Sequence, residues 1–291
     1  MKRKGIILAG GHGTRLHPLT VATSKQMLAV YDKPMVYYPM SVLMLAGIRD
    51  ILLISTPQSI ESYRVLFEDG SKFGLNITYK IQEKPGGISQ AFILGEKFLD
   101  GHPSALILGD NIFYGTGLSN ILNEANADSN STVFVNRVNN PSSYGILDFD
   151  KDWNPISIEE KPLSPKSNFA VTGLYFFDNN ASNYAKTVKP SDRGELEITS
   201  LIEHYMNLGL LNAKIMGRGY AWLDTGTQDH LLDAANFVRT LQNRQGLQIG
   251  CLEEIAYRKE WISLETLKNQ AKHYQKTSYG AYLKTILEES R

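Results

Sequence analysis

Apolar runs rich in β-branched residues alternate with segments of helical periodicity over the first half of the chain. Short runs with the length of buried strands lie at 5–9, 50–55, 76–81 and 104–109. Apolar residues recur at helical spacing over 35–46, 58–68, 88–98 and 117–126, which predicts helices there. Pro34 suits the first turn of a helix, and Pro39 is expected to kink it. The alternation predicts an α/β fold: a Rossmann-like, mixed and mostly parallel sheet flanked by helices.

The pattern changes in the rest of the chain. Strands added antiparallel to the sheet are predicted at Thr132–Val138, Gly145–Phe149, Pro155–Glu160 and Ala170–Phe177. After Thr227, a predicted N-cap, the spacing is helical until Gly246, and further helices are expected at 253–260, 264–275 and 280–289. We therefore expect an α/β domain over residues 1–228 and a helical C-terminal segment over 229–291.

Composition narrows the class of partner. The chain has 291 residues, 42% of them hydrophobic, and its 30 Lys and Arg balance 30 Asp and Glu. This neutrality argues against nucleic acid or a membrane surface as partner, but a local cationic pocket could still hold a mononucleotide. The one cysteine, Cys251, excludes an intramolecular disulfide and a cysteine-based zinc site. No apolar run approaches a membrane span, and a cytoplasmic location is expected.

A glycine-rich loop directly follows the first predicted strand and reads Gly10-Gly11-His12-Gly13-Thr14-Arg15-Leu16. Glycines allow backbone N–H groups to approach an anion, and Arg15 and Lys25 add positive charge. The loop lacks the third glycine of a dinucleotide fingerprint, and no Gly-Lys-Ser/Thr of a P-loop follows. The pattern favours a polyphosphate site, with a tight turn that binds nothing as the alternative.

Three further charged residues lie where strands end. Asp110 follows the apolar run at 104–109, and Asp224 stands in Trp222-Leu223-Asp224-Thr225-Gly226-Thr227. Both could hold Mg²⁺ together with substrate phosphates, or could only cap a turn or helix. Lys161 ends the predicted strand before Pro162, which should keep it extended. It could bind a phosphate or pair with a neighbouring glutamate in solvent.

These motifs together resemble a known family, the sugar-1-phosphate nucleotidylyltransferases. The family's signature residues match in order: the glycine loop with Ser24-Lys25-Gln26, Leu108-Gly109-Asp110-Asn111, Tyr144-Gly145, Glu159-Glu160-Lys161-Pro162, Val171-Thr172-Gly173-Leu174-Tyr175 and Trp222 to Thr227. Within the family the chain is similar to the bacterial glucose-1-phosphate thymidylyltransferases. Motifs particular to that subfamily are Tyr31-Asp32-Lys33-Pro34-Met35, Arg193-Gly194-Glu195-Leu196-Glu197-Ile198-Thr199 and Glu254-Ile255-Ala256-Tyr257-Arg258. The resemblance covers essentially the whole chain.

The resemblance implies a reaction and its catalytic residues. dTTP and α-D-glucose 1-phosphate would give dTDP-glucose and pyrophosphate by Mg²⁺-dependent in-line displacement at the α-phosphorus, the first step of dTDP-L-rhamnose and related deoxysugar synthesis. Arg15 and Lys25 would neutralise the triphosphate, and Lys161 would hold the sugar phosphate. Asp110 and Asp224 would bind Mg²⁺.

The resemblance also assigns binding residues. Gly10, Gly11, Gly13, Gln82 and Gly87 would bind the nucleotide, with Gln82 and the backbone of Gly87 reading the base. The glucose phosphate would be bound by Tyr144, Gly145, Glu160, Lys161, Val171, Tyr175 and Arg193. In this subfamily the C-terminal helices build a homotetramer and a second nucleotide site for feedback inhibition. The matching residues are Tyr114, Gly115, Gly217, Arg218, Glu254, Ile255 and Arg258.

Three departures from the family pattern stand out. His12 replaces the usual serine, Ala29 replaces a proline, and Gly86 replaces the aspartate of Pro-Asp-Gly-Leu in the base-binding stretch. Loss of that aspartate is expected to loosen the loop, which leaves UTP use open.

Two further functions compete with nucleotidyl transfer. One is a metal-dependent glycosyltransferase that uses Asp148-x-Asp150, which would release no pyrophosphate. The second is a non-catalytic regulatory subunit, against which the intact set of charged residues argues.

Overall fold

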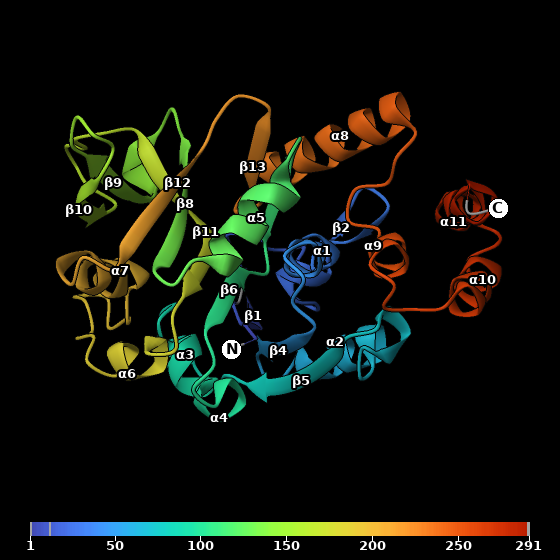
Figure 1. The fold of residues 1–291 in the computed structure, drawn as a ribbon, viewed down its shortest axis with the longest axis horizontal. Helices are drawn as coiled ribbons and strands as arrows, with labels where there is room; N and C mark the ends of the chain where they lie inside the picture. Colours follow the sequence, from blue (N-terminus) through green and yellow to red (C-terminus); the bar gives the residue numbers. More distant parts are fainter. Residues whose placement is uncertain (1, 12, 290–291) are drawn as a thin grey trace.

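The computed structural model describes residues 2–11 and 13–289 (Figure 1). Within them, nine strands form the central sheet, whose main path runs β10-β9-β11-β6-β1-β4-β5, while β8 pairs with both β11 and β12. These strands are β1 (Lys4–Ala9), β4 (Asp50–Ser55), β5 (Asn76–Ile81), β6 (Ser104–Leu108), β8 (Ser131–Arg137), β9 (Gly145–Phe149), β10 (Pro155–Glu160), β11 (Phe169–Phe177) and β12 (Leu211–Met216). β6, β1, β4 and β5 run parallel, and β9, β10 and β11 pair antiparallel. The predicted α/β class is confirmed.

Side chains of the parallel strands alternate between two buried clusters. Ile7, Leu53 and Ile107 belong to one cluster, and their chain neighbours Ile6 and Leu52 belong to the other. This follows from the two-residue period of a strand, which sends successive side chains to opposite faces of the sheet. The continuous apolar runs seen in the sequence therefore reflect a sheet covered on both faces.

Helices cover the two faces of this sheet, as Figure 1 shows. They are α1 (Tyr37–Leu45), α2 (Ile60–Phe67), α3 (Gln90–Leu94), α4 (Glu96–Leu99), α5 (Leu118–Ala127), α6 (Ala181–Ala185), α7 (Ile198–Asn207), α8 (Gln228–Gln245), α9 (Leu252–Arg258), α10 (Leu264–His273) and α11 (Ser278–Glu289). The single helix predicted at 88–98 is divided at Gly95 into α3 and α4. Thr227 caps α8, accepting a hydrogen bond from the His230 N–H, and Gly246 ends it, both as predicted.

The expected kink at Pro39 is wrong. α1 begins at Tyr37, so Pro39 lies in its first turn, where a missing N–H breaks no helical hydrogen bond. Pro34 does not start that helix but belongs to a short ribbon of β2 (Ala29–Val30) and β3 (Lys33–Pro34).

A second ribbon lies outside the main sheet and was not predicted. β7 (Asn111–Gly115) pairs antiparallel with β13 (Tyr220–Asp224), which lies more than a hundred residues later in the chain. Asn111 faces Asp224 across the ribbon. The ribbon thus brings the two candidate metal-binding motifs together.

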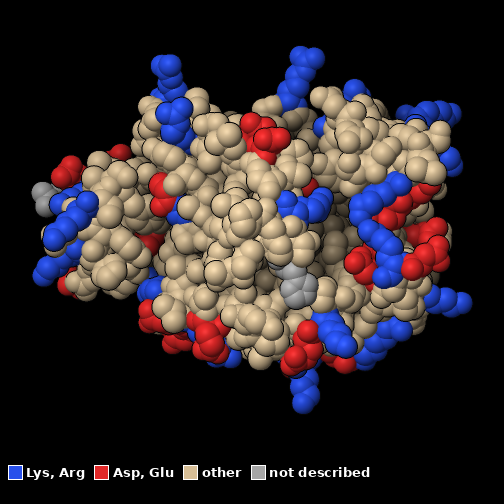
Figure 2. All heavy atoms as spheres, turned by 180° about the vertical axis from the view of Figure 1, so that it is seen from behind, with Lys and Arg blue, Asp and Glu red and all other residues tan. Residues whose placement is uncertain are grey.

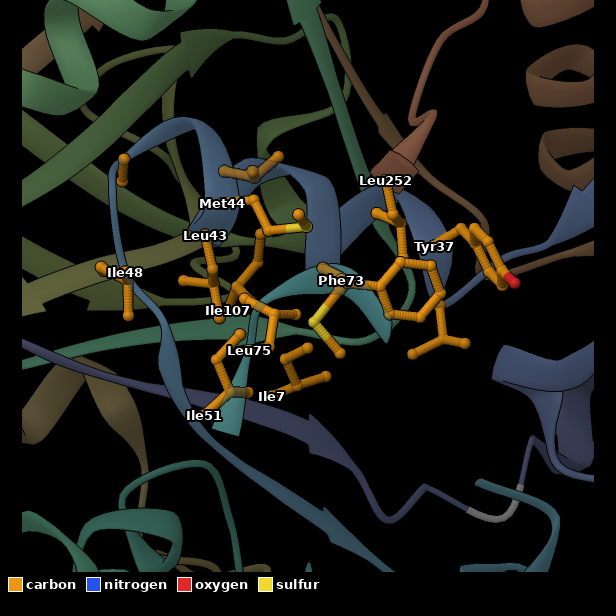
Figure 3. Close-up of a cluster of buried hydrophobic side chains, with 14 of the residues drawn as sticks. Ile7, Tyr37, Leu43, Met44, Ile48, Ile51, Phe73, Leu75, Ile107 and Leu252 are labelled. Atoms are coloured by element: carbon orange, nitrogen blue, oxygen red, sulfur yellow. The ribbon is translucent and has the colours of Figure 1, made fainter. Parts of the chain in front are cut away.

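The C-terminal helices share the core of the α/β part. Leu252 from α9 lies in the same buried cluster as Ile7, Tyr37 and Phe73 (Figure 3). Leu267 of α10 and Leu283 of α11 are fully buried in that cluster. The division at residue 228 stays a prediction, but the segment after it packs against the sheet's helices.

The described residues include no helix of the length and apolarity that a membrane span requires. Lys and Arg side chains are interspersed with Asp and Glu over the face drawn in Figure 2.

Candidate active site

A lysine and an aspartate form the centre of the candidate site, where β1 and β6 end. Lys25 lies in a short 3₁₀ helix, Lys25–Met27, and is only 6% exposed. Its Nζ lies 2.5 Å from Oδ2 of Asp110, which follows β6. Burial of this cation beside a carboxylate fixes both side chains at the edge of the sheet where ligands bind in α/β folds.

Asp224 is held beside Asp110 by the β7–β13 ribbon. Thr225 Oγ1 donates a hydrogen bond of 2.9 Å to the carbonyl oxygen of Asp110. Burial, and then the negative charge of Asp110, raise the pKa of Asp224. Asp224 does not cap α8, because Thr227 does. Two carboxylates therefore converge, and their mutual repulsion favours a cation between them.

Arg15 reaches the same place from the glycine loop. It lies in the 3₁₀ helix Thr14–Leu16 and is exposed. A Cβ built on Gly226 would lie 3.3 Å from Asp224 Oδ2 and 3.7 Å from Arg15 Nη1, so both side chains approach one point.

Gly11 lines a cleft of about 280 Å³, and Gly13 packs on the side chain of Lys25. His12 lies outside the described residues.

Asn111 supports this centre and was not singled out from the sequence. It is 2% exposed, and its Nδ2 donates to Asp110 Oδ1 over 2.9 Å. Its Oδ1 accepts from the backbone N–H of Gly173 at 3.1 Å and from Trp222 Nε1 at 2.6 Å. The signal available in the sequence was its place directly after Asp110, where a predicted strand ends. Asn111 therefore ties the carboxylate to two other elements.

Gln82 lies at the other side of the glycine loop, directly after β5. It is 4% exposed, and its backbone N–H donates to Ser55 O over 2.8 Å. Its Oε1 lies so close to Gly10 that a Cβ there would overlap it. Gly87 has a φ of +92° and would place a Cβ against the backbone of Leu196, so only glycine fits. The structure thus places Gly10 beside Gln82, with Gly87 in the loop that follows.

A cavity of about 510 Å³ lies between the end of β10 and α7 and includes Glu160, Lys161 and Arg193 in its lining. Arg193 Nη2 lies 3.3 Å from Glu160 Oε1 and 2.8 Å from Glu197 Oε1. Gly145 faces Glu160 across the β9–β10 pair. The cavity is therefore lined by both carboxylates, from Glu160 and Glu197, and cations, from Lys161 and Arg193.

Lys161 differs from its predicted conformation. The strand ends at Glu160 as expected, but Lys161 has a φ of +47° and is not extended. Its N–H donates a hydrogen bond of 2.9 Å to Tyr144 O. This bond stabilises the unusual backbone conformation of Lys161. Its Nζ pairs with Glu160 Oε1 at 3.3 Å and remains half-exposed, so the ammonium can reach an added anion.

The cavity lining does not include three other apolar or aromatic candidates, Tyr144, Val171 and Tyr175. Val171 and Tyr175 are buried in β11, and burial raises the pKa of Tyr175, with smaller effects from Glu160 and Asp110. Tyr144 packs its ring 5.2 Å from that of Trp222, and burial followed by the charge of Asp224 raises its pKa as well. Both hydroxyls therefore stay protonated at neutral pH.

A separate cavity of about 600 Å³ lies between β7 and the C-terminal helices. Five of the predicted second-site residues line it: Tyr114, Gly115, Glu254, Ile255 and Arg258. Tyr114 donates to Gln245 Oε1 over 2.6 Å, and Arg258 Nε donates to Glu254 Oε1 over 2.8 Å. The other two, Gly217 and Arg218, lie between β12 and β13 and are not among the lining residues.

The glycosyltransferase hypothesis based on Asp148-x-Asp150 finds little support. Asp150 accepts hydrogen bonds from the backbone N–H groups of Asp152 and Asn154 and from Asn154 Nδ2. These bonds close the β9–β10 turn and occupy the carboxylate, the ordinary role of a turn aspartate. Among residues 2–11 and 13–289, no group of three or more His, Cys, Asp or Glu side chains converges as a metal site. Two carboxylates with substrate phosphates remain sufficient for Mg²⁺.

Known proteins of similar sequence have one family in common. Residues 4–240 match the family model described as nucleotidyl transferase. The chain is 55% identical over 281 residues to the glucose-1-phosphate thymidylyltransferase of Neisseria gonorrhoeae, covering 96% of this chain and 98% of that protein. It is 50% identical over 287 residues to the enzyme of the same name from Mycobacterium tuberculosis, covering 99% and 100%.

Solved structures show the same fold. A Bacillus anthracis protein described as a glucose-1-phosphate thymidylyltransferase, in complex with sucrose, has a TM-score of 0.75 and 38% identity, covering 81% of this chain and 95% of that one. A UDP-glucose pyrophosphorylase complexed with UDP-glucose has a TM-score of 0.74 at 23% identity, covering 82% and 99%, and shares the fold. The chain therefore belongs to the nucleotidyl transferase family, and within it to the glucose-1-phosphate thymidylyltransferases.

Proposed function

We propose that the protein joins dTTP and α-D-glucose 1-phosphate into dTDP-glucose and releases pyrophosphate. The observation that carries this proposal is the convergence of Arg15, Lys25, Asp110 and Asp224 at one edge of the sheet. The two relatives compared above, both named glucose-1-phosphate thymidylyltransferase, support the same reaction.

The chemistry is a single displacement. An oxygen of the sugar phosphate forms a bond to the α-phosphorus of dTTP while the bond to the bridging oxygen of pyrophosphate breaks. Negative charge grows on the departing pyrophosphate. Arg15, exposed at the glycine loop, and Lys25, fixed by Asp110, are the cations that would stabilise it. The enzyme would contribute alignment and charge rather than a nucleophile of its own.

The carboxylate pair fits a magnesium ion. Asp224 is disfavoured as an anion by burial and by Asp110, so a cation held between the two would relieve that repulsion. Asp110 and Asp224 would hold the ion, which supplies charge neutralisation of the triphosphate when bound. Asn111 holds the Asp110 carboxylate in place without it, and Thr225, next to Asp224, is bonded to the backbone carbonyl of Asp110.

The sugar phosphate would bind in the cavity between the end of β10 and α7. Lys161 would exchange its exposed pairing with Glu160 for the phosphate, and Glu160 would then accept hydrogen bonds from sugar hydroxyls. Arg193 pairs with Glu160 and orients its carboxylate for that role.

The cavity at the C-terminal helices is proposed as the regulatory nucleotide site, in a homotetramer assembled through those helices. Its aromatic Tyr114 and charged Arg258 are suited to a base and a phosphate. We propose that the protein catalyses the first step towards dTDP-rhamnose and that this end product inhibits it here. Pyrophosphate release at saturating dTDP-rhamnose tests this: unchanged turnover would exclude feedback.

The assay that tests the reaction measures pyrophosphate release with glucose 1-phosphate and each of dTTP, UTP, dCTP and GTP. Release with dTTP, dependent on Mg²⁺ and on the sugar phosphate, is expected. UTP is the second candidate, because thymine and uracil share the edge that Gln82 would read, and a methyl pocket discriminates by only about 1–3 kcal/mol. Release with GTP alone would overturn the assignment.

A further inference from the structure

Gln90, the first residue of α3, holds the side chain of Gln82 by a hydrogen bond that fixes which way the Gln82 amide points. Gln90 Oε1 accepts from Gln82 Nε2 at 2.6 Å and from the backbone N–H of Gly86 at 3.1 Å. A backbone N–H can only donate, so the Gln90 atom facing it must be the oxygen. That oxygen can only accept, so the Gln82 atom facing it must be the nitrogen.

The orientation of Gln82 determines what it offers a ligand. Its Oε1 faces Gly10, where the absence of a side chain leaves room for it. No donor from residues 2–11 or 13–289 bonds to this oxygen. Gln82 therefore presents an acceptor, Oε1, and the second hydrogen of Nε2 as a donor.

This pattern matches one class of pyrimidine. Thymine and uracil carry an N3–H donor next to carbonyl acceptors. A side chain pairs with them when it offers an acceptor to the N3–H and a donor to a neighbouring carbonyl. Cytosine has the reverse, an N3 acceptor next to an N4 amino donor. A glutamine free to rotate can match either base by exchanging its oxygen and nitrogen, whereas one fixed by Gln90 matches only thymine and uracil.

Gly86 is part of the same arrangement. A Cβ at Gly86 would lie 2.8 Å from both Cδ and Nε2 of Gln90, closer than side chains pack. The glycine that departs from the family pattern thus leaves space for the Gln90 amide, and its N–H fixes that amide. The expectation that Gly86 loosens the loop is not supported here, because residue 86 is bonded to Gln90 and to Leu196.

We propose that Gln90 is a positioning residue for base specificity: by fixing the amide of Gln82 it selects thymine and uracil over cytosine. This rests on the proposed function, in which Gln82 reads the base. In this role Gln90 acts through Gln82, whose Nε2 donates to Gln90 Oε1.

The test compares kcat/KM for dTTP and dCTP, by pyrophosphate release, in the wild-type protein, Gln90→Leu and Gln90→Glu. Leucine removes the acceptor, so the dTTP-to-dCTP ratio should fall roughly tenfold, through KM for the nucleotide, while KM for glucose 1-phosphate is unchanged. Glutamate keeps the acceptor oxygens for Gln82 and Gly86, so the ratio should stay within about threefold of wild type.

Gly86→Ala supplies an independent arm if the leucine variant does not fold. The added methyl displaces Gln90 without altering its chemistry and should lower the ratio in the same direction. A wild-type protein inactive with dTTP would overturn the proposed function and this inference with it. An active wild type whose ratio is unchanged in Gln90→Leu or, should that variant not fold, in Gly86→Ala would overturn the inference alone.

Discussion

The charged residues of the cleft are arranged for a ligand rather than for stability. Burial, and after it the charge of Asp110, raises the pKa of Asp224. The nearby cations Lys25 and Arg15 lower this pKa but do not outweigh the two effects that raise it. The sequence could identify each of these residues from its motif but not their convergence, because Asp224 reaches Asp110 only through a strand pair formed across more than a hundred residues. The same holds for Gln90, whose role depends on the position of Gln82.

Asp224→Asn should make the protein more stable at pH 8 while abolishing activity. Because the folded pKa of Asp224 lies above the unfolded value, its contribution to stability is greatest at low pH and declines as pH rises through the folded pKa. The gain in Tm should therefore disappear near pH 4. A melting series from pH 4 to pH 8 measures this; a variant less stable than wild type at pH 8 would contradict it.

Arg15→Ala and Lys25→Ala should each lower kcat by roughly two to three orders of magnitude, because these cations stabilise charge that develops during pyrophosphate departure. Steady-state kinetics with dTTP and glucose 1-phosphate provide the measurement. Lys268→Ala, a substitution at an exposed position on α10, is the control and should leave kcat unchanged. An unaltered kcat in both active-site variants would show that neither cation takes part.

At the level of elements, the sequence predicts what depends on local pattern and misses what depends on distant partners. The four parallel strands and α8 follow from apolar runs and from the Thr227 and Gly246 caps. β7, β12, β13, α6 and α7 were not predicted. β7 and β13 are strands because they pair with one another outside the main sheet, and their short mixed sequences carry no clear two-residue period.

Trp222→Phe tests the link between this ribbon and the carboxylates. The change retains a ring beside Tyr144 but removes the hydrogen bond that Trp222 Nε1 donates to Asn111. We expect a loss of about 1 kcal/mol in the free energy of unfolding and a several-fold lower kcat, because Asn111 orients Asp110. Urea denaturation and turnover measure the two effects. Trp153→Phe, at an exposed position in the β9–β10 turn, should change neither.

For the whole molecule, the C-terminal helices are part of the fold and not only an attachment to it. Leu252, Leu267 and Leu283 fill the same buried cluster as Ile7 and Tyr37. Helical periodicity predicted these helices but could not indicate which surface they cover, because that depends on packing between distant segments. The cavity between them and β7 exists only because of this packing.

Leu283→Ala should destabilise the whole protein by about 2–5 kcal/mol, since it leaves a cavity in this shared core. Leu264→Ala, at an exposed site on α10, should stay within about 0.5 kcal/mol of wild type. Chemical denaturation followed by tryptophan fluorescence compares them. Equal stabilities would mean that the C-terminal helices do not contribute to the core.

The central claim is that this cleft transfers the nucleotidyl group of dTTP directly to glucose 1-phosphate. The most direct measurement follows the α-phosphorus of dTTP labelled with ³²P, in the presence of Mg²⁺, with and without the sugar phosphate. The account predicts that the label appears in dTDP-glucose, with one pyrophosphate released per molecule formed, only when both substrates are present. Label that remained in dTTP, or that became attached to the protein, would contradict it.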